Sequence, residues 1–278
     1  YIPEIYRRGV RSFVVSRLPE DMTSCPDANF LQVVSPLKAL QRLAERHREA
    51  FDIPVVGITG SNGKTVVKEW LYQLLSPEKN VTRSPRSYNS QIGVPLSVWN
   101  LDERSEVGLF EAGISEPGEM EALQSVIQPT IGVFTCLGDA HQENFTSYEQ
   151  KCLEKLKLFK DAKVLVYDMD DARVVGCVNR SAFKGEYFAW SRQRRDVPLY
   201  IASVEKREAE TVVSYIYKGK EAACSIPFID EASLANSVSC LAVCLHLGMS
   251  PETIAARMAV LEPVAMRLEV KEGRSGCT

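Results

Sequence analysis

The stretch Val55-Val-Gly-Ile-Thr-Gly-Ser-Asn-Gly-Lys-Thr65 decides the fold of this 278-residue chain. Its first five residues are mostly apolar and β-branched, which predicts a buried strand. The six residues that follow form a glycine-rich loop, and 66–75 carries apolar residues at helical spacing. A strand, a glycine-rich loop and a helix are the setting in which backbone N–H groups and a helix dipole bind phosphate.

Each position of the loop has an expected role. Backbone groups of Gly60, Ser61, Asn62 and Gly63 cradle phosphate oxygens, Lys64 reaches the β- and γ-phosphates of a nucleotide, and the Thr65 hydroxyl binds Mg²⁺. Ile58 stands where the common phosphate-loop pattern has its first glycine, so this is a shorter form. The alternative is a glycine-rich turn that only caps a helix.

The remaining chain alternates between strand-like and helix-like segments, which predicts an α/β fold with a mostly parallel sheet flanked by helices. The strand-like segments are 107–111, 130–135 and 163–168, and the helical ones are 118–127, 147–159, 234–247 and 251–261. Short strands at 187–190, 199–204, 211–217 and 222–226 predict a small antiparallel sheet.

Composition excludes several classes of protein. Lys and Arg number 33 against 36 Asp and Glu, so no basic excess points to nucleic acid. No apolar stretch approaches the roughly 20 residues that span a bilayer, so we expect no membrane insertion. The eight cysteines form no C-x-x-C pair, and with three histidines this favours a reduced, cytoplasmic protein without a zinc site.

Four further segments carry a family resemblance. They are Asn89-Ser-Gln-Ile-Gly-Val-Pro-Leu96, Glu111-Ala-Gly113 with Pro117-Gly-Glu119, Thr135-Cys-Leu-Gly-Asp-Ala-His141, and Ala235-Asn236. Together with the phosphate loop, these segments resemble those of the Mur ligase family and occur in the same order along the chain. The family consists of ATP-dependent amide-forming enzymes of peptidoglycan synthesis. The first segment resembles the branch that adds D-alanyl-D-alanine. Ser90, Gln91, Cys136, Ala235 and Ser239 depart from the family's pattern, which puts individual contacts in doubt.

The resemblance implies a domain organisation. Residues 1–36 resemble the end of a substrate-binding α/β domain, 37–262 the central ATP-binding domain, and 263–278 a hinge to a third domain. We therefore expect a fragment cut at both ends. The first residues of the sequence also resemble those of a variant that is fused to an alanine racemase. Pyridoxal phosphate is therefore expected only if a racemase domain follows.

The resemblance also assigns metal-site residues. Glu111 ends a predicted strand, where a carboxylate suits Mg²⁺, although it could be a solvated side chain or a helix cap. His141 is implied at a second metal, although a lone histidine is more often structural. Lys155 is implied as a carbamylated lysine that acts in catalysis and at the metal, and its alternative is a surface lysine.

Other residues are assigned to nucleotide and substrate. Asn236 is implied to hydrogen-bond adenine, unless it pairs structurally within its apolar helix. Arg267 is implied to approach the phosphates from the hinge. Asn89, Ser90 and Gln91 are implied to contact the muramoyl peptide, unless they form an ordinary turn.

The implied reaction consumes ATP with Mg²⁺. UDP-N-acetylmuramoyl-tripeptide is phosphorylated to an acyl phosphate, and the amine of D-alanyl-D-alanine attacks it to form an amide. Two alternatives remain open: a different Mur-type or folylpolyglutamate-type ligase, and a nucleotide-binding module without turnover by itself.

Overall fold

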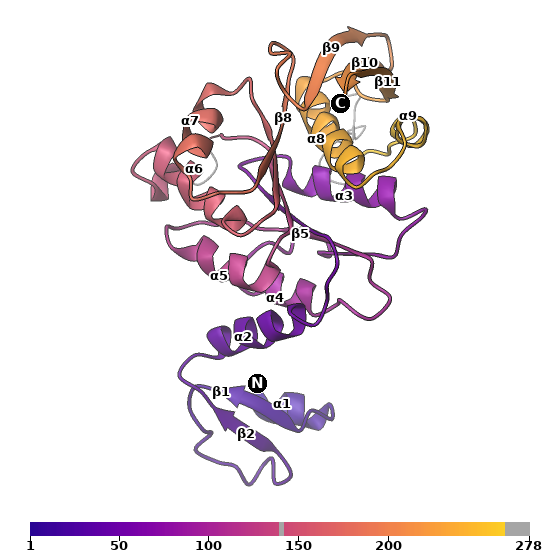
Figure 1. Ribbon diagram of the computed structural model, residues 1–278. Coiled ribbons are helices and arrows are strands. Elements are labelled where there is room, and N and C mark those ends of the chain that lie inside the picture. The colour runs from indigo at the N-terminus through magenta and orange to yellow at the C-terminus, as the bar shows by residue number, and fades with distance from the viewer. Residues whose placement is uncertain (139–141, 265–278) are drawn as a thin grey trace, which may run out of the picture.

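The structure is a computed structural model that describes residues 1–138 and 142–264. A small N-terminal unit lies apart from the main body (Figure 1). It consists of α1 (Ile2–Arg7), β1 (Ser12–Val15) and β2 (Asn29–Gln32). The two strands pair in parallel, and the rings of Phe13 and Phe30 stack with 5.4 Å between their centroids.

Within the described residues the main body contains one nine-stranded sheet, in the order β11-β10-β9-β8-β7-β6-β3-β5-β4. The strands are β3 (Val55–Thr59), β4 (Val81–Arg83), β5 (Val107–Glu111), β6 (Ile131–Phe134), β7 (Val164–Asp168), β8 (Glu186–Ser191), β9 (Leu199–Lys206), β10 (Thr211–Tyr217) and β11 (Lys220–Ile226). Pairs from β4 to β9 are parallel, and β9, β10 and β11 pair antiparallel. The predicted α/β class, mostly parallel with a small antiparallel part, is confirmed.

Helices cover both faces of this sheet (Figure 1). One layer contains α3 (Lys64–Leu75), α8 (Glu231–His246) and α9 (Pro251–Met258); the other contains α2 (Pro36–Arg48), α4 (Gly93–Val98), α5 (Glu119–Ile127), α6 (Tyr148–Leu156) and α7 (Ala172–Arg180). Strand β3 serves both cores, because successive side chains point to opposite faces. Val56 and Ile58 pack with the first layer, and Val55 packs with the second.

The helix after the phosphate loop is anchored by a large buried side chain. Trp70 of α3 is fully buried, and its ring stacks on Phe228 with 4.8 Å between centroids. Its Nε1 donates to the carbonyl of Glu262 at 3.0 Å, so the buried indole N–H is satisfied. Burying a side chain of this size contributes about 1.5–3 kcal/mol, and it fixes the direction in which α3 leaves the loop.

The strand at 187–190 was predicted to belong to the antiparallel part, and this is wrong. It is part of β8, which pairs in parallel with β7 over five residues and with β9 over two. The physical reason is α7, which the sequence analysis did not predict. Parallel strands need a crossover connection, and α7 supplies it between β7 and β8.

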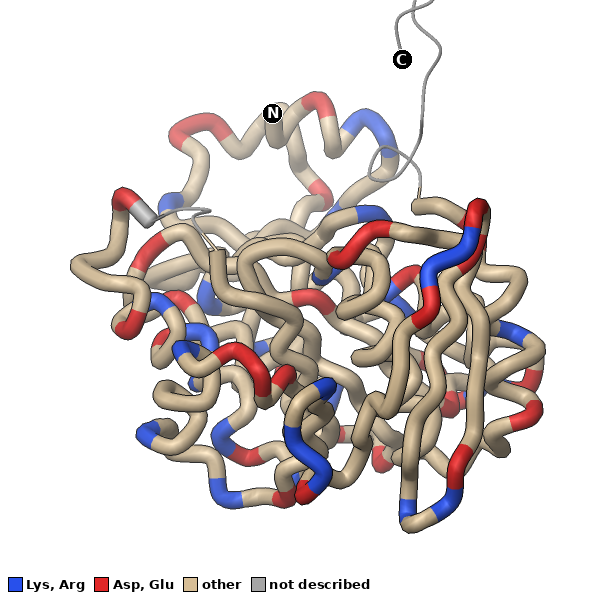
Figure 2. Tube along the Cα trace, turned by 90° about the horizontal axis from the view of Figure 1, so that it is seen from above, with Lys and Arg blue, Asp and Glu red and all other residues tan. Residues whose placement is uncertain are grey.

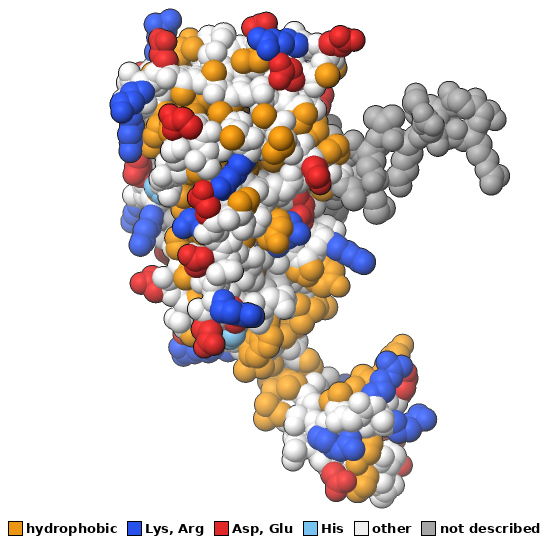
Figure 3. All heavy atoms as spheres, turned by 90° about the vertical axis from the view of Figure 1, so that its right-hand side faces the viewer, with side chains coloured by type: hydrophobic (Ala, Val, Ile, Leu, Met, Phe, Trp, Pro, Cys, Tyr) orange, Lys and Arg blue, Asp and Glu red, His pale blue; other side chains and the backbone are white. Residues whose placement is uncertain are grey.

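The surface carries charges of both signs. Figure 2 shows Lys and Arg interspersed with Asp and Glu along the trace. Apolar side chains gather where the main body narrows towards the N-terminal unit (Figure 3). Helix α2 lies at the end of the main body next to that unit (Figure 1), and it exposes Leu37 and Leu43. In the described part of the chain, no helix has the length and apolar character to cross a membrane.

Candidate active site

The phosphate loop lies at the carboxyl end of β3, between β6 and β5 in the sheet. Two of its residues must be glycine. A Cβ on Gly60 would lie 2.0 Å from Thr135 Oγ1, and Gly63 has a φ of +83°, which L side chains rarely adopt. Helix α3 begins at Lys64, so its N-terminal N–H groups and dipole face the loop. The sequence therefore builds an anion-binding helix start here.

The loop is fastened to the segment after β6. The N–H of Ser61 donates to the carbonyl of Cys136 at 2.8 Å, and the Ser61 hydroxyl exchanges hydrogen bonds with the backbone of Gly138. Thr135 Oγ1 donates to the carbonyl of Asn62. These bonds fix Ser61 and Asn62 against the segment after β6, and they already use the N–H of Ser61.

Lys64 turns back over its own loop. Its Nζ donates to the carbonyl of Gly60 at 2.8 Å and to that of Ser61 at 3.2 Å. The ammonium thus lies where the loop curves, which is where the negative charge of a phosphate is best stabilised. That Lys64 binds phosphate stays a prediction.

Thr65 donates a hydrogen bond to Glu111. Thr65 Oγ1 lies 3.0 Å from Glu111 Oε2, although 46 residues separate them, because β5 lies beside β3. Oxygens that bind one octahedral Mg²⁺ at about 2.0–2.1 Å lie roughly 2.9 Å apart. Glu111 is fully buried, which excludes the solvated alternative. Among the described residues no three His, Cys, Asp or Glu side chains form a cluster that could hold a metal ion.

Of the three predicted substrate residues, two lie at the cleft beside the phosphate loop and one does not. Asn89 Nδ2 lies 3.5 Å from Glu111 Oε2, and both Asn89 and Ser90 line the cleft beside the phosphate loop. Gln91 does not line it. Its side chain accepts from Gln41 at 2.9 Å and donates to the carbonyl of Glu119 at 3.1 Å, so it joins α2 to α5.

Lys155 also lines this cleft. This cleft of about 120 Å³ is bounded by Gly60, Ser61, Lys64, Asn89, Ser90, Gly113, Ile114, Ser115 and Lys155. Lys155 is only 3% exposed, so the surface-lysine alternative is wrong. Burial, followed by the nearby charges of Lys64 and Lys151, lowers the pKa of Lys155 to about 7. A substantial fraction of this amine is therefore neutral at physiological pH.

Asn236 lies against the phosphate loop from α8. A Cβ on Gly63 would lie 2.3 Å from Asn236 Oδ1, which places the carboxamide directly beside the loop. Its neighbour Ala235 lines a cavity of about 530 Å³ together with Asp168, Trp190 and Val238. Burial raises the pKa of Asp168 to about 6, so this cavity holds a carboxyl group that is readily protonated.

Two predicted residues, His141 and Arg267, lie outside the described residues. Two buried lysines near the site were not predicted from the sequence. Lys68 is fully buried and forms an ion pair with Glu111, and Lys151 is fully buried and donates to the carbonyl of Gly138. Both stand one helical turn from a predicted site residue, Lys64 and Lys155 respectively, and that spacing was the available signal.

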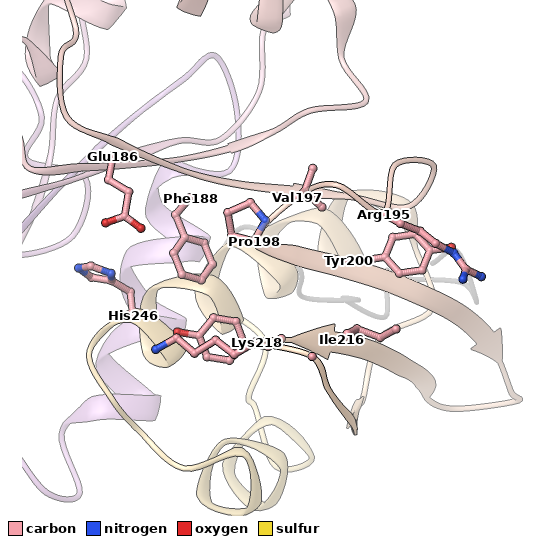
Figure 4. Close-up of a pocket in the computed structure, with 11 residues that line it drawn as sticks. Glu186, Phe188, Arg195, Val197, Pro198, Tyr200, Ile216, Lys218 and His246 are labelled. Carbon is pink, nitrogen blue, oxygen red and sulfur yellow. The ribbon is translucent and has the colours of Figure 1, made fainter.

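A larger cavity of about 690 Å³ lies elsewhere, between β8, β9, β10 and the end of α8 (Figure 4). Glu186, Phe188, Lys218 and His246 are among its lining residues. It shares none of them with the cleft at the phosphate loop. Its larger volume does not make this cavity the reaction site, because neither the phosphate loop nor the start of α3 lines it.

Comparison with known proteins agrees with this geometry. The chain is 28% identical to a UDP-N-acetylmuramoyl-tripeptide–D-alanyl-D-alanine ligase of Bacillus subtilis, over 99% of this chain and 59% of that protein. It is 30% identical to a ligase of the same name from Borreliella burgdorferi, over 88% of this chain and 54% of that protein. The chain thus spans little more than half the length of these relatives.

Solved structures share the fold. MurF ligase from Thermotoga maritima, solved in complex with ADP, has a TM-score of 0.84 at 25% identity, with 98% of this chain and 62% of that chain covered. MurF from Acinetobacter baumannii has a TM-score of 0.88 at 20% identity, with 99% and 59% covered. The family model of the Mur ligase middle domain matches residues 58–244. Because this match spans more than half of the chain and contains the phosphate loop, Glu111, Lys155 and Asn236, the chain belongs to the Mur ligase family.

Proposed function

We propose that this chain is the ATP-handling part of a ligase that joins D-alanyl-D-alanine to UDP-N-acetylmuramoyl-tripeptide. One observation carries the proposal: Lys64, Asn89 and Lys155 line one cleft at the carboxyl ends of parallel strands, and Asn89 lies 3.5 Å from Glu111 of the Thr65–Glu111 pair. Ligands of open α/β sheets bind at this edge. Both curated relatives described above are ligases of this name.

The phosphates of ATP bind at the start of α3. The N-terminal dipole of α3 and the Lys64 ammonium stabilise the negative charge that the γ-phosphoryl group carries during transfer. To reach phosphate oxygens, the ammonium exchanges its present contacts with the carbonyls of Gly60 and Ser61. Lys64 is therefore the residue that holds the transferred group in place.

Thr65 and Glu111 hold the Mg²⁺ ion, and His141 binds a second ion. Bound there, Mg²⁺ neutralises the phosphate charge that opposes approach of a carboxylate. Glu111 supplies the fixed carboxylate because the register of β5 against β3 pairs Glu111 with Ile58, one residue before the end of β3. The fixed strands leave little reorganisation to be done when ATP binds.

Lys155 faces the phosphate site as a partly neutral amine. Its low pKa permits attack on CO₂, which yields a carbamate and releases a proton. A carbamate converts a cation into an anion with two oxygens, and this suits a position beside a metal ion and the arriving peptide. Lys155 then acts as a metal-binding and orienting group.

The other contacts complete the ligand set. Asn236 and the cavity beside Ala235 take the adenine end, and Arg267 approaches the phosphates. Asn89 and Ser90 face the muramoyl peptide, and Gln91 holds their loop. Residues 37–262 form the central domain, with parts of the substrate-binding and third domains at 1–36 and 263–278. The reaction proceeds in the cytoplasm, where ATP is supplied.

The proposal is tested by acceptor selectivity in the full-length protein. ADP release is measured with UDP-N-acetylmuramoyl-tripeptide and, in turn, D-alanyl-D-alanine, a single amino acid or a glutamate acceptor. Of these acceptors, we expect only D-alanyl-D-alanine to support ADP release. Selective turnover with another acceptor would assign the chain to a different Mur-type or folylpolyglutamate-type ligase.

A further inference from the structure

Lys68 is a buried cation that the proposed reaction does not use. It lies on α3 one turn after Lys64, and its side chain is fully buried. Charged side chains are rarely buried to this degree unless they are paired. Its Nζ lies 2.9 Å from Glu111 Oε1 and 3.0 Å from Glu69 Oε1.

The same ammonium also holds the loop that carries Asn89 and Ser90. It donates to the carbonyl of Ser84 at 2.8 Å and to that of Arg86. Arg86 has a φ of +50°, a left-handed backbone that is costly for a side chain other than glycine, and the bond to Lys68 helps to hold it. Lys68 is thus fixed by two hydrogen bonds to carbonyl oxygens and by two ion pairs. Its contact with Glu111 Oε1 is an ion pair alone, and Oε1 accepts no hydrogen bond within the described residues.

As a result, the two oxygens of Glu111 have different surroundings. Oε1 faces the Lys68 ammonium at 2.9 Å. Oε2 faces the Thr65 hydroxyl at 3.0 Å and the Asn89 amide at 3.5 Å. Oε1 of Glu111 thus faces a protein cation, and Oε2 faces the position beside Thr65 where the proposed metal ion binds.

We infer that Lys68 determines metal specificity: by occupying Oε1 it makes Glu111 bind a divalent cation through Oε2 alone. The inference rests on the proposed role of Glu111 as a metal ligand. Mg²⁺ and Mn²⁺ accept a carboxylate through a single oxygen in a six-coordinate shell, whereas Ca²⁺ takes six to eight oxygens and often both oxygens of one carboxylate. Lys68 therefore selects the smaller ions.

The ratio of affinities is the quantity that reports this role. Lys68 repels every divalent cation at the site to a similar extent, so its charge affects Mg²⁺ and Ca²⁺ alike. Only the number of oxygens that Glu111 offers differs between the two ions. A purely structural lysine would change both affinities together and leave their ratio unaltered.

The test uses the full-length protein, freed of metal and saturated with a non-hydrolysable ATP analogue. Bound Mn²⁺ is followed by its electron paramagnetic resonance signal while Mg²⁺ or Ca²⁺ displaces it. We expect Lys68→Met to shift the ratio of displacing concentrations towards Ca²⁺ by roughly tenfold, the size of effect typical for partners of metal ligands. Lys160→Met is the matched control, because Lys160 is half-exposed and pairs only weakly with Asp161 at 3.9 Å.

An unchanged ratio in folded Lys68→Met protein overturns the inference. Glu111→Gln separates this failure from failure of the proposed function. If Glu111→Gln leaves Mn²⁺ affinity unchanged, Glu111 is not a ligand and the proposed metal site is wrong. If it weakens Mn²⁺ while Lys68→Met leaves the ratio unaltered, only the inference is wrong.

A second measurement needs no variant. A crystal structure of the wild-type protein with Mn²⁺ and the ATP analogue should show Glu111 bound through Oε2, with Lys68 still at Oε1. Coordination through both oxygens, or departure of Lys68 from Glu111, contradicts the inference. This result stands even if the Lys68→Met protein does not fold, as removing the partner of a buried charge can prevent folding.

Discussion

The carboxamide of Asn236 lies where a side chain on Gly63 would begin: a Cβ on Gly63 would be 2.3 Å from Asn236 Oδ1. The start of α3 and the middle of α8 are far apart in the sequence. They are in direct contact at this point. Gly63 also has a φ of +83°, so both its backbone and its surroundings require glycine.

Gly63→Ala should therefore weaken binding of an ATP analogue by roughly tenfold or more, because the loop or Asn236 must move to admit the methyl group. Gly118→Ala is the matched control. Gly118 also precedes a helix with positive φ, +88°, but its Cβ would meet nothing within 4 Å. Titration calorimetry measures both variants, and equal affinities would show that the Asn236 contact is irrelevant to the nucleotide.

Lys64→Ala should lower the rate of ADP release by roughly 100-fold or more in the full-length protein. In the proposed reaction its ammonium stabilises charge that develops during phosphoryl transfer, and loss of one such donor typically costs this much. A steady-state ADP assay measures the effect, with Lys160→Ala as the control lysine from the exposed surface. Activity retained by Lys64→Ala would remove Lys64 from the mechanism.

Lys155 should form a carbamate whose amount rises with pH. With a pKa of about 7, roughly a tenth of the amine is neutral at pH 6 and roughly nine tenths at pH 8. Only the neutral amine attacks CO₂, so a ¹³C carbamate resonance from labelled bicarbonate should grow between these values. The resonance should be absent from Lys155→Met and present in Lys160→Met. Its absence from wild-type protein at pH 8 would mean that Lys155 acts as an amine.

Glu154, the neighbour of Lys155, should matter for stability rather than chemistry. Its Oε1 accepts from the N–H groups of Gly118 at 2.8 Å and Met120 at 3.3 Å, at the start of α5. Glu154→Ala should lower the free energy of unfolding by about 1.5–3 kcal/mol, since hydrogen bonds to a charged group are lost. Denaturant titration checks this.

Glu149→Ala serves as the control for Glu154→Ala. Glu149 pairs with Arg180 at the surface, with both side chains about half exposed, and such pairs contribute little. The two variants should therefore differ clearly in stability. Equal stabilities would show that the N-terminus of α5 does not depend on Glu154.

Sequence reasoning reached the phosphate loop and Glu111 because both depend on local patterns. A strand, a glycine loop and a helix occur in direct succession at 55–75, and Glu111 ends a strand of apolar residues. Parallel strands bring their carboxyl ends to one edge, so Glu111 could be expected near Thr65 before any coordinates. Their separation of 3.0 Å required the strand order, in which β5 lies directly beside β3.

Other features depended on contacts that no local pattern reveals. Lys68 is followed by Glu69 and reads as an exposed helical pair, yet the loop at Ser84–Arg86 closes over it. Helix α7 contains Gly176 and β-branched valines, which have low helix propensity, so it was missed and β8 was assigned to the wrong part of the sheet. In both cases tertiary packing outweighs the local preference.

In the proposed reaction, the peptide carboxylate attacks the γ-phosphate of ATP. The most direct measurement uses UDP-N-acetylmuramoyl-tripeptide labelled with ¹⁸O in its reacting carboxylate, together with ATP and D-alanyl-D-alanine. The labelled oxygen attacks phosphorus, and it leaves with phosphate when the amine forms the amide. Mass spectrometry should find one ¹⁸O atom in the inorganic phosphate released with ADP. Label in AMP, with release of pyrophosphate, would contradict the account.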